Sequence, residues 1–436
     1  MTRVLLIELN EINFAFVAGY GRMGKLPNLT RLIAAHGVSE TSSERRYEEL
    51  EPWIQWVTAH TGQTLRQHAV FRLGDIVDRD IPQIWETLED RGLKVGAISP
   101  MNAKNRTRNA AFFIPDPWTE TRIDGSYLQK QMYGAIAQAV NDNATRKMTI
   151  KSAFWLALGA FGTAQPGNYF SYIASVLKAR GRPWMRSLVL DRLLADLFIG
   201  QVKQTDPDFA SLFLNAGAHI QHHYMFSSAC YSGQMSNPDW YIDPSEDPLL
   251  DILELYDHII GEIETAFPQA RLMIATGLHQ EPHEELTFYW RLRDHATFLR
   301  RIGAPFVRVA PRMSRDFQVV CADAAQAAQC EQILASAAAQ ADGEALFEID
   351  NRGSDLFVSL VYAHDISPTM GWTAGGVSYA NLKDDVAFVA VKNGVHHGIG
   401  YFVDTGAPAR SRFALAQLPS LIESALLPAR LATAAE

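Results

Sequence analysis

The sequence is poor in cysteine, and the three that it has, Cys230, Cys321 and Cys330, include no Cys-x-x-Cys pair. An odd number without that spacing argues against a framework of disulfide bonds. Basic residues are also fewer than acidic ones, with 39 lysines and arginines against 48 acidic residues. The only notable basic runs, Arg45-Arg46 and Arg300-Arg301, are short. Because nucleic acid is bound through basic clusters, the formal net charge of −9 excludes it as a main partner.

Long hydrophobic runs are also missing. A membrane-spanning helix needs about 18 apolar residues, and the nearest approach, Ser152–Ala164, is shorter. This run predicts a buried or lid helix, with peripheral membrane contact as the second interpretation. We also expect no signal peptide at the start of the chain, because the apolar run after Arg3 is too short and has no small-residue cleavage site. We therefore expect a cytoplasmic protein without a transmembrane segment.

Apolar runs alternate with helical patterns along much of the 436-residue chain. Arg3–Leu9 and Val95–Ile98 are continuously apolar, which is typical of parallel strands that are covered on both faces. Between them lie two predicted helices, one around residues 29–33 that closes at Gly37 and one that leads from Pro52 to Gly62. The alternation predicts an α/β fold with a doubly wound, mainly parallel sheet and helices on both faces.

Two segments interrupt this pattern. Residues 119–181 predict a mostly helical insertion, and residues 301–365 predict a small α+β insertion with a hairpin that turns at 350–353. The core then consists of three parts, residues 1–118, 182–300 and 366–436. Within these parts we expect a proline-rich loop at 112–118 and a further buried core strand at 386–391, followed by a glycine-rich loop at 393–400.

Histidines gather where predicted strands end. The apolar run Leu212–Leu214 is followed within a few residues by His219, His222 and His223. The spacing of His219 and His223 places both on one face of a helix, as a shared metal ion requires. A single buried histidine is more often bonded to the backbone, but three beside one strand end favour a site.

Similar polar clusters follow other strands. Glu8, Asn10 and Glu11 lie at the end of the first strand. His279 follows the strand at 272–275, and His396 and His397 follow the strand at 386–391. Parallel strands deliver their carboxyl ends to one edge of the sheet, so we expect these side chains to converge. Histidine with carboxylate and amide oxygens is a suitable ligand set for zinc and similar ions.

The order of these landmarks resembles the alkaline phosphatase superfamily, and most nearly its type I phosphodiesterase/nucleotide pyrophosphatase-like branch. The resemblance covers about two thirds of the chain and leaves out the two insertions. In that family the first strand ends in a metal-binding Asp, and a turn similar to residues 25–28 follows. A Thr or Ser nucleophile then precedes a Pro/Trp segment that ends in Thr-Gly, as Trp56 and Thr61-Gly62 do here. Asp-x-x-x-His, Asp-His and a last His complete the pattern.

Several reactive positions of the family are occupied by other residues. The first-strand Asp falls on Asn10, and the nucleophile falls between Glu48 and Pro52, where Glu51 is the best-placed reactive group. The Asp-x-x-x-His motif falls on Ala218 and His222, or on His219 and His223 after a shift of one residue. The Asp-His pair falls on Leu278-His279, and the last His falls on His396 or His397. Carboxylate ligands are thus replaced, whereas the histidines are kept or increased.

This change favours one zinc-like ion over two, because two-metal phosphoryl transfer depends on anionic ligands. The metal ligands are expected among Asn10, His219, His222, His223, His279, His396 and His397, with Glu51 or Glu8 as general base. The resemblance implies a metal-dependent hydrolase or transferase of a phosphate-type ester, or of a sulfate ester, on a small-molecule, glycan-linked or lipid-linked substrate. The alternatives are a catalytically inactive binding protein of the same fold, and a mutase or lyase.

Overall fold

The centre of the protein is an eight-stranded, mostly parallel sheet. The computed structural model describes residues 3–141, 149–165, 167–312 and 315–427. The strand order is β17 (Arg412–Ala414), β2 (Ser39–Ser42), β16 (Ile399–Asp404), β6 (Arg271–Ala275), β1 (Val4–Leu9), β5 (Phe209–Leu214), β3 (Val95–Ile98) and β4 (Phe112–Ile114). Only β16 runs antiparallel to its neighbours. Every residue of β1 and β5 is buried, as their continuous apolar sequences require.

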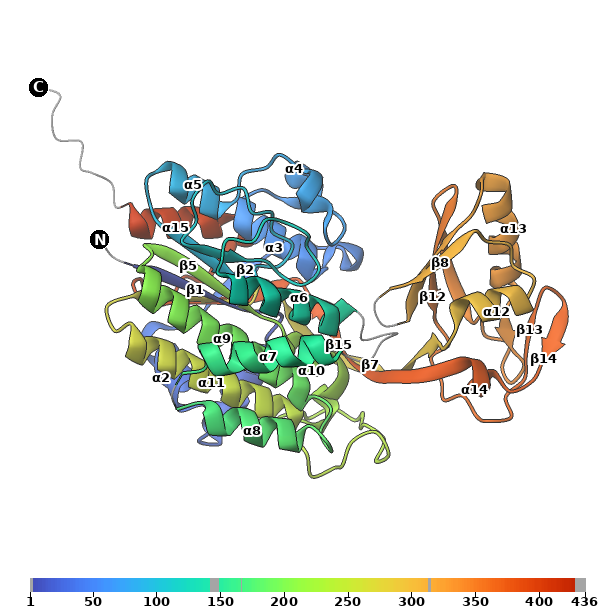
Figure 1. The fold of residues 1–436 in the computed structure, drawn as a ribbon. Coiled ribbons are helices and arrows are strands. Elements are labelled where there is room, and N and C mark those ends of the chain that lie inside the picture. Colours follow the sequence, from blue (N-terminus) through green and yellow to red (C-terminus); the bar gives the residue numbers. More distant parts are fainter. Residues whose placement is uncertain (1–2, 142–148, 166, 313–314, 428–436) are drawn as a thin grey trace, which may run out of the picture.

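Helices cover both faces of this sheet (Figure 1). One face packs against α1 (Phe14–Arg22), α2 (Pro27–His36), α9 (Met185–Thr205), α10 (Ala216–Tyr224) and α11 (Pro248–Ala266). The other face packs against α3 (Pro52–Thr61), α5 (Ile84–Asp90) and α15 (Leu418–Leu426). Three further helices, α6 (Tyr127–Asn141), α7 (Ile150–Thr163) and α8 (Tyr169–Lys178), lie over α9. The fold class predicted from the sequence is confirmed.

Local sequence explains where α2 and α3 begin and end. Both α2 and α3 carry proline at the first helical position, where its fixed φ and its missing N–H cost nothing. Gly37 and Gly62 follow their last residues with φ values of 73° and 71°, a left-handed backbone that glycine adopts without a steric penalty. The turn signals predicted these boundaries correctly.

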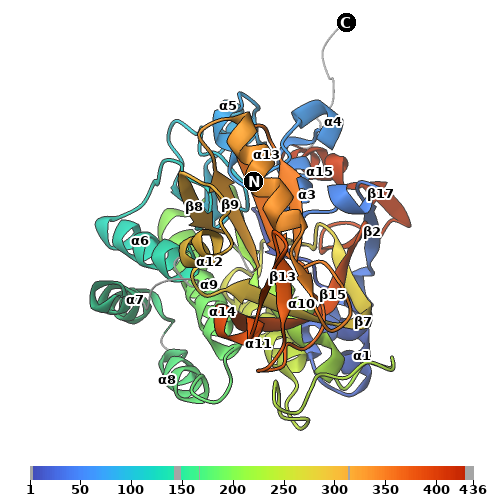
Figure 2. The ribbon, with the colours of Figure 1, turned by 90° about the vertical axis from the view of Figure 1, so that its right-hand side faces the viewer.

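A smaller lobe stands beside the core and faces the viewer in Figure 2. It has its own hydrophobic cluster and is built from α12 (His295–Arg301), β8 (Arg308–Pro311), β9 (Asp316–Val320), α13 (Ala324–Ala335), β10 (Ala338–Ala339), β11 (Phe347–Asn351), β12 (Asp355–Leu360), β13 (Trp372–Ala374), β14 (Val377–Tyr379) and α14 (Leu382–Asp385). Two long antiparallel strands, β7 (His279–Leu292) and β15 (Val386–His397), run between this lobe and the core (Figure 1). We call this strand pair the ribbon.

Two expectations for strands and loops were wrong. The 112–118 segment opens with a strand rather than a loop, because Phe112 and Phe113 are fully buried where β4 completes the edge of the sheet. The run at 386–391 is not a core strand. It opens β15, which pairs with β7 and continues to His397, so the expected glycine-rich loop is mostly extended strand. An apolar run shows that a strand is buried but does not name its partner.

His68 gives the fold a dependence on pH. It ends α4 (Leu65–His68) and is buried; its Nδ1 accepts a hydrogen bond from the Val70 N–H (3.0 Å), and its Nε2 lies 3.1 Å from Thr58 Oγ1. Burial, with a smaller contribution from Arg79, lowers the pKa of His68 from 6.5 to about 4. Protonation of Nδ1 would also break the bond to Val70.

The unfolded chain binds this proton near pH 6.5 and the folded chain only near pH 4, so stability is lost as the pH falls through that window. As the pH falls from about 7 to 5, we expect proton binding by His68 in the unfolded chain to lower the free energy of unfolding by about 2 kcal/mol. Urea unfolding at both pH values checks this, with His68→Gln as the comparison. An equal pH dependence in both proteins would contradict the assignment.

Candidate metal centre

Three elements of the core and the ribbon bring Glu11, His222 and His396 together. Glu11 follows β1, His222 lies on α10 directly after β5, and His396 lies near the end of β15. Glu11 has a φ of 61°, which is uncommon for a residue other than glycine and often marks a functional turn. Its backbone is held in this conformation by hydrogen bonds of its N–H to the Thr276 carbonyl (3.1 Å) and of its carbonyl to the Gln280 N–H (3.1 Å).

The ligand atoms of these three residues form a small triangle. Glu11 Oε2 lies 3.1 Å from Nε2 of His222 and 3.1 Å from Nε2 of His396, and the two Nε2 atoms are 3.2 Å apart. Ligands at zinc–nitrogen and zinc–oxygen distances of about 2.0–2.1 Å in a tetrahedron are separated by about 3.3–3.4 Å. The triangle therefore fits three corners of such a tetrahedron, and two histidines with one carboxylate are a donor set known from catalytic zinc sites.

The charges of this triangle reinforce each other. Burial acts to raise the pKa of the Glu11 carboxyl, but the charges of His396 and His222 and their hydrogen bonds outweigh it and hold that pKa well below its usual range. Burial acts to lower the pKa of His396, yet the Glu11 carboxylate outweighs it and raises that pKa. An ionised, acceptor-only carboxylate thus lies against two imidazoles, as a metal ligand must.

Amide side chains fix the Glu11 carboxylate from behind. Gln280 Nε2 donates to Oε2 (2.5 Å) and Asn10 Nδ2 donates to Oε1 (3.0 Å). Asn10 also donates to Asn215 Oδ1 (2.8 Å) and accepts from Trp56 Nε1 (2.7 Å). The predicted ligand Asn10 is therefore fully engaged as a support of the neighbouring Glu11. Outer partners of this kind set the orientation of ligands in metal sites.

Glu51 lies on the other side of His396. It precedes α3, its side chain is 34% exposed, and its Oε2 is 3.8 Å from His396 Nδ1, whereas Glu11 faces Nε2 of the same ring. Burial, and to a smaller extent the charge of Glu11, raises the pKa of the Glu51 carboxyl. The position predicted for the nucleophile in the resemblance is thus occupied by a carboxylate that contacts the triangle.

His279 and His397 form a separate, looser group with Glu281. Their rings are 4.7 Å apart between centroids, and the Nε2 atoms lie 3.5 Å and 4.0 Å from Glu281 Oε1. His279 Nδ1 donates to the Ile399 carbonyl (2.6 Å), which leaves its Nε2 free to bind a metal. In the ribbon His397 pairs with His279 and His396 pairs with Gln280. Because neighbouring side chains alternate between faces, the two groups lie on opposite faces of the ribbon.

His219 and His223 do not join either group. Their ring centroids are 4.8 Å apart, so the predicted spacing on one helix brings them into contact, but His219 is exposed. Within the described residues neither belongs to a set of three ligand atoms close enough to share an ion. The structure therefore divides the seven predicted ligands among separate places instead of gathering them around one cation.

Glu8 lies in the core rather than beside the histidines of the triangle. Its side chain is fully buried between β1 and α3, where Oε1 accepts a hydrogen bond from His60 Nε2 (2.8 Å). The His60 ring packs against Trp85, with centroids 4.7 Å apart. In the described part of the chain, Glu8 Oε2 and His60 Nδ1 have no hydrogen-bond partner. Glu8 is therefore a core residue, and we do not carry it into the proposed site.

One cation acts on the triangle directly, and a second acts on that cation. Lys392 is on β15, and its charge acts on the pKa of His396. Arg315 comes from the smaller lobe beside β9, and its guanidinium carbon lies 4.5 Å from the centre of the Tyr289 ring. Burial lowers the pKa of the Lys392 ammonium, and the charge of Arg315 lowers it further. A lysine ammonium that acts on His396 is suited to attract an anionic ligand.

Sequence reasoning named Glu11 in the polar cluster after the first strand but did not choose it as a ligand, and it missed Gln280 and Arg315. Glu11 lies one residue beyond the position that the resemblance assigns to a metal ligand, and its left-handed backbone leaves no trace in the sequence. Gln280 lies beside the predicted His279 but acts on the opposite face of the ribbon. Arg315 belongs to the smaller lobe, so only the tertiary fold brings it to the core. A carboxylate adjacent to Asn10 was the one available signal.

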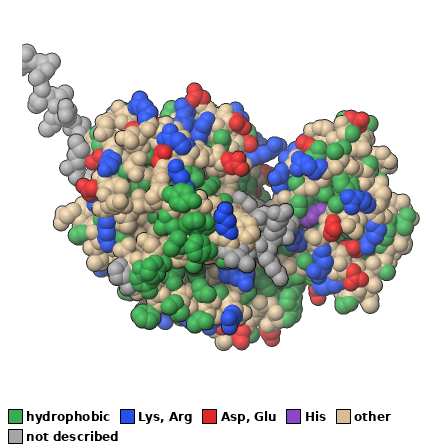
Figure 3. Space-filling model, in the orientation of Figure 1, with side chains coloured by type: hydrophobic (Ala, Val, Ile, Leu, Met, Phe, Trp, Pro, Cys, Tyr) green, Lys and Arg blue, Asp and Glu red, His purple; other side chains and the backbone are tan. Residues whose placement is uncertain are grey.

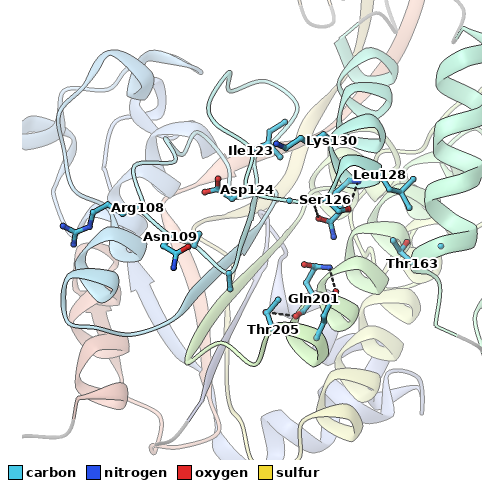
Figure 4. A pocket seen from close by; sticks show the side chains of 16 residues that line it. Arg108, Asn109, Ile123, Asp124, Ser126, Leu128, Lys130, Thr163, Gln201 and Thr205 are labelled. Carbon is cyan, nitrogen blue, oxygen red and sulfur yellow. Dashed lines mark hydrogen bonds between the residues drawn. The ribbon is translucent and has the colours of Figure 1, made fainter.

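A hollow of about 680 Å³ lies elsewhere, between the segment 108–130 and the ends of α7 and α9 (Figure 4). Its lining includes Asn109, Ser126, Thr163, Gln201 and Thr205, and Asp124 is already paired with Arg122. Local hydrogen bonds run from the Ser126 N–H to Gln129 Oε1 (2.7 Å) and from Thr205 Oγ1 to the Gln201 carbonyl (2.8 Å), as the dashed lines show. The hollow contains no histidine or cysteine, so we place the chemistry at the triangle.

No family model matches the chain, and no curated protein matches it in sequence. Among solved structures, phosphonoacetate hydrolase from Sinorhizobium meliloti, in complex with phosphonoacetate, is similar at 12% identity with a TM-score of 0.44, over 98% of this chain and 96% of that one. Human ectonucleotide pyrophosphatase/phosphodiesterase 5 is similar at 10% identity with a TM-score of 0.45, over 97% of this chain and 94% of that one. The name of the second structure is that of the branch which the sequence landmarks resemble. At such identities and TM-scores, neither likeness indicates which residues react.

Proposed function

We propose that the protein is a metal-dependent hydrolase or transferase of phosphate-type esters, with one zinc-like ion held by Glu11, His222 and His396. The observation that carries the proposal is the triangle of ligand atoms, with sides of 3.1, 3.1 and 3.2 Å. Three protein ligands leave one corner of a tetrahedron open, which is the arrangement of catalytic rather than structural zinc sites. The substrate is a small, glycan-linked or lipid-linked ester of phosphate, or of sulfate.

The residues of the chain divide the work as follows. When bound, the ion polarises an ester oxygen and makes a water molecule nucleophilic near neutral pH. Glu51 takes up the proton that the attacking water or acceptor loses, and it lies close enough to His396 to keep that ring in place. Lys392 and Arg315 attract the negative charge of the ester, and Gln280 holds the Glu11 carboxylate.

One observation favours a second candidate, a catalytically inactive binding protein. No Ser or Thr lies between Glu48 and Pro52, so the segment that should supply a nucleophile offers carboxylates instead. A protein of this kind would keep the metal and bind an anionic ligand without turning it over. The two candidates therefore differ in turnover and agree in metal content.

Turnover of a panel of phosphomonoesters, phosphodiesters and sulfate esters tests the proposal. We expect hydrolysis that stops when a chelator removes the ion and returns when zinc is restored. Metal bound at one equivalent without turnover of any ester would support the binding protein. A protein without affinity for zinc or a similar divalent ion would overturn both candidates. A product that is rearranged rather than hydrolysed would indicate a mutase or lyase.

Glu51 is tested by two substitutions that separate its possible roles. Glu51→Gln keeps the shape and an acceptor oxygen beside His396, but it cannot take up a proton. If Glu51 is the general base, the Glu51→Gln and Glu51→Ala variants should both lose about 10²–10⁴-fold in kcat while they keep the metal. Near-normal turnover in Glu51→Gln, with a loss of about 10–100-fold in metal affinity in Glu51→Ala, would instead make it a positioning residue. Metal titration and kcat measurements on the same preparations decide between them.

A further inference from the structure

The outer faces of α7 and α8 expose an unusual number of large hydrophobic side chains. On α7, Phe154, Leu158 and Phe161 are 58%, 38% and 71% exposed, and their spacing places them on one face of the helix. The same is true of Phe170 and Ile173 on α8, which are 85% and 59% exposed. Val176 and Leu177 extend the same surface. Figure 3 shows these hydrophobic side chains gathered over the two helices, and we call this surface the α7–α8 face.

This exposure does not result from a failure of the helices to pack. Leu156 and Ala160 of α7 pack against the main core, and Tyr172 of α8 is buried with its hydroxyl bonded to Asp196 Oδ2 (2.9 Å). Both helices therefore have an inner apolar face that meets α9 and a second, outer apolar face. Monomeric soluble proteins rarely expose hydrophobic patches of this kind unless the patch binds something.

The segment that carries the face has charge of one sign, although Lys178 also acts on the carboxylate of Asp251 in α11. Between Asp142 and Asp191 the sequence contains seven lysines and arginines and no acidic residue, although the whole chain carries a net charge of −9. Lys151, Lys178, Arg180 and Arg186 are exposed, and within the described ranges they form no ion pair. Arg182 is the exception, because it pairs with Glu246. Unpaired cations beside exposed aromatic side chains are the combination found in segments that lie in the surface of a membrane.

We propose that the α7–α8 face docks the protein onto a membrane surface that contains anionic lipids. The phenylalanines and aliphatic side chains enter the boundary between headgroups and acyl chains, and the four cations contact the lipid phosphates. Among the described residues no helix is both long and apolar enough to cross a bilayer, so docking is peripheral. A second copy of the chain is a poorer occupant, because two faces of the same positive charge repel each other.

Sedimentation of the full chain with lipid vesicles tests this proposal. We expect binding to phosphatidylcholine vesicles that contain phosphatidylglycerol, little binding to pure phosphatidylcholine, and a loss of binding at high salt. The triple variant Phe161→Ser, Phe170→Ser, Ile173→Ser and the double variant Lys178→Glu, Arg180→Glu should each bind at least about tenfold more weakly. Phe71→Ser and Trp240→Ser are the matched controls, because those side chains are 58% and 61% exposed but lie outside the face.

The outcomes separate the possible occupants. Binding that the two control variants keep and the face variants lose supports docking. No binding to either kind of vesicle would overturn it, as would face variants that bind like the wild type. A wild-type dimer in light scattering that becomes a monomer in the triple variant, without vesicle binding, would assign the face to self-association. Circular dichroism shows whether each variant is folded, and the test does not depend on the proposed ester chemistry.

Discussion

Replacing His222 or His396 by alanine is expected to remove the metal ion and the activity together. Each variant removes one of the three ligand atoms of the triangle and leaves Glu11 with a single imidazole. Loss of an outer partner typically lowers metal affinity by about 10–100-fold, so loss of a ligand should exceed about a hundredfold. Zinc titration measures the affinity, and metal analysis of purified protein gives the number of ions per chain. Ester turnover should fall in proportion to the metal content.

The chain offers a matched control for each of these variants. His219→Ala changes an exposed histidine on the same helix as His222, and His397→Ala changes the neighbour of His396 on the opposite face of the ribbon. Both controls should keep the ion. If His219→Ala lost the ion as completely as His222→Ala, the triangle would not be the site. Two ions per chain, with one lost in His397→Ala, would show that the looser group with His279 is also occupied.

The second large effect is expected in the core, at the buried pair of Glu8 and His60. Glu8→Ala or His60→Ala leaves the other polar group in an apolar environment without the hydrogen-bond partner that it has in the described part of the chain. Breaking a buried pair from one side typically costs about 3–5 kcal/mol of stability, because an uncompensated polar group remains. Urea unfolding of the single variants measures this loss, and the metal affinity of the folded fraction should not change.

A double substitution provides the control. Glu8→Leu with His60→Leu removes both polar groups and fills the space between β1 and α3 with apolar side chains, which is often neutral for stability. The double variant should therefore be more stable than either single variant. Single variants that lose less than about 1 kcal/mol would show that the pair is not buried as described. Loss of turnover at full metal content in Glu8→Ala would return Glu8 to the list of catalytic candidates.

The fold class followed from features that are local in sequence. Continuous apolar runs such as Val4–Leu9 need cover on both faces, and Gly37 and Gly62 end helices because they adopt a left-handed backbone. The pairing of strands is not local. Nothing in the sequence of β15 states that its partner is β7 rather than a strand of the core, so its apolar first half was assigned to the wrong sheet.

The candidate site was predicted by residue type and by neighbourhood but not residue by residue. His222 and His396 lie in the triangle. At the end of β1, the carboxylate that contacts them belongs to Glu11, and the predicted ligand Asn10 supports Glu11. The choice between adjacent residues depends on which face of a strand or turn each side chain occupies. At Glu11 that choice follows from a backbone φ of 61°, which no periodicity in the sequence records.

The ribbon joins the smaller lobe to the core and also carries His396. Within the ribbon, the pairing of β15 with β7 shifts register twice, between Phe388 and Ala390 and between Lys392 and Gly394. Because side chains alternate, inserting or deleting one residue after Gly394 would exchange the faces of the two neighbouring imidazoles and turn His396 away from Glu11. Insertions or deletions after Gly394 are therefore tolerated only when they change the length by two residues, or together with a compensating bulge. Any twisting of the lobe is transmitted through the same two strands, so the connector between the lobes also sets the alignment of the metal centre.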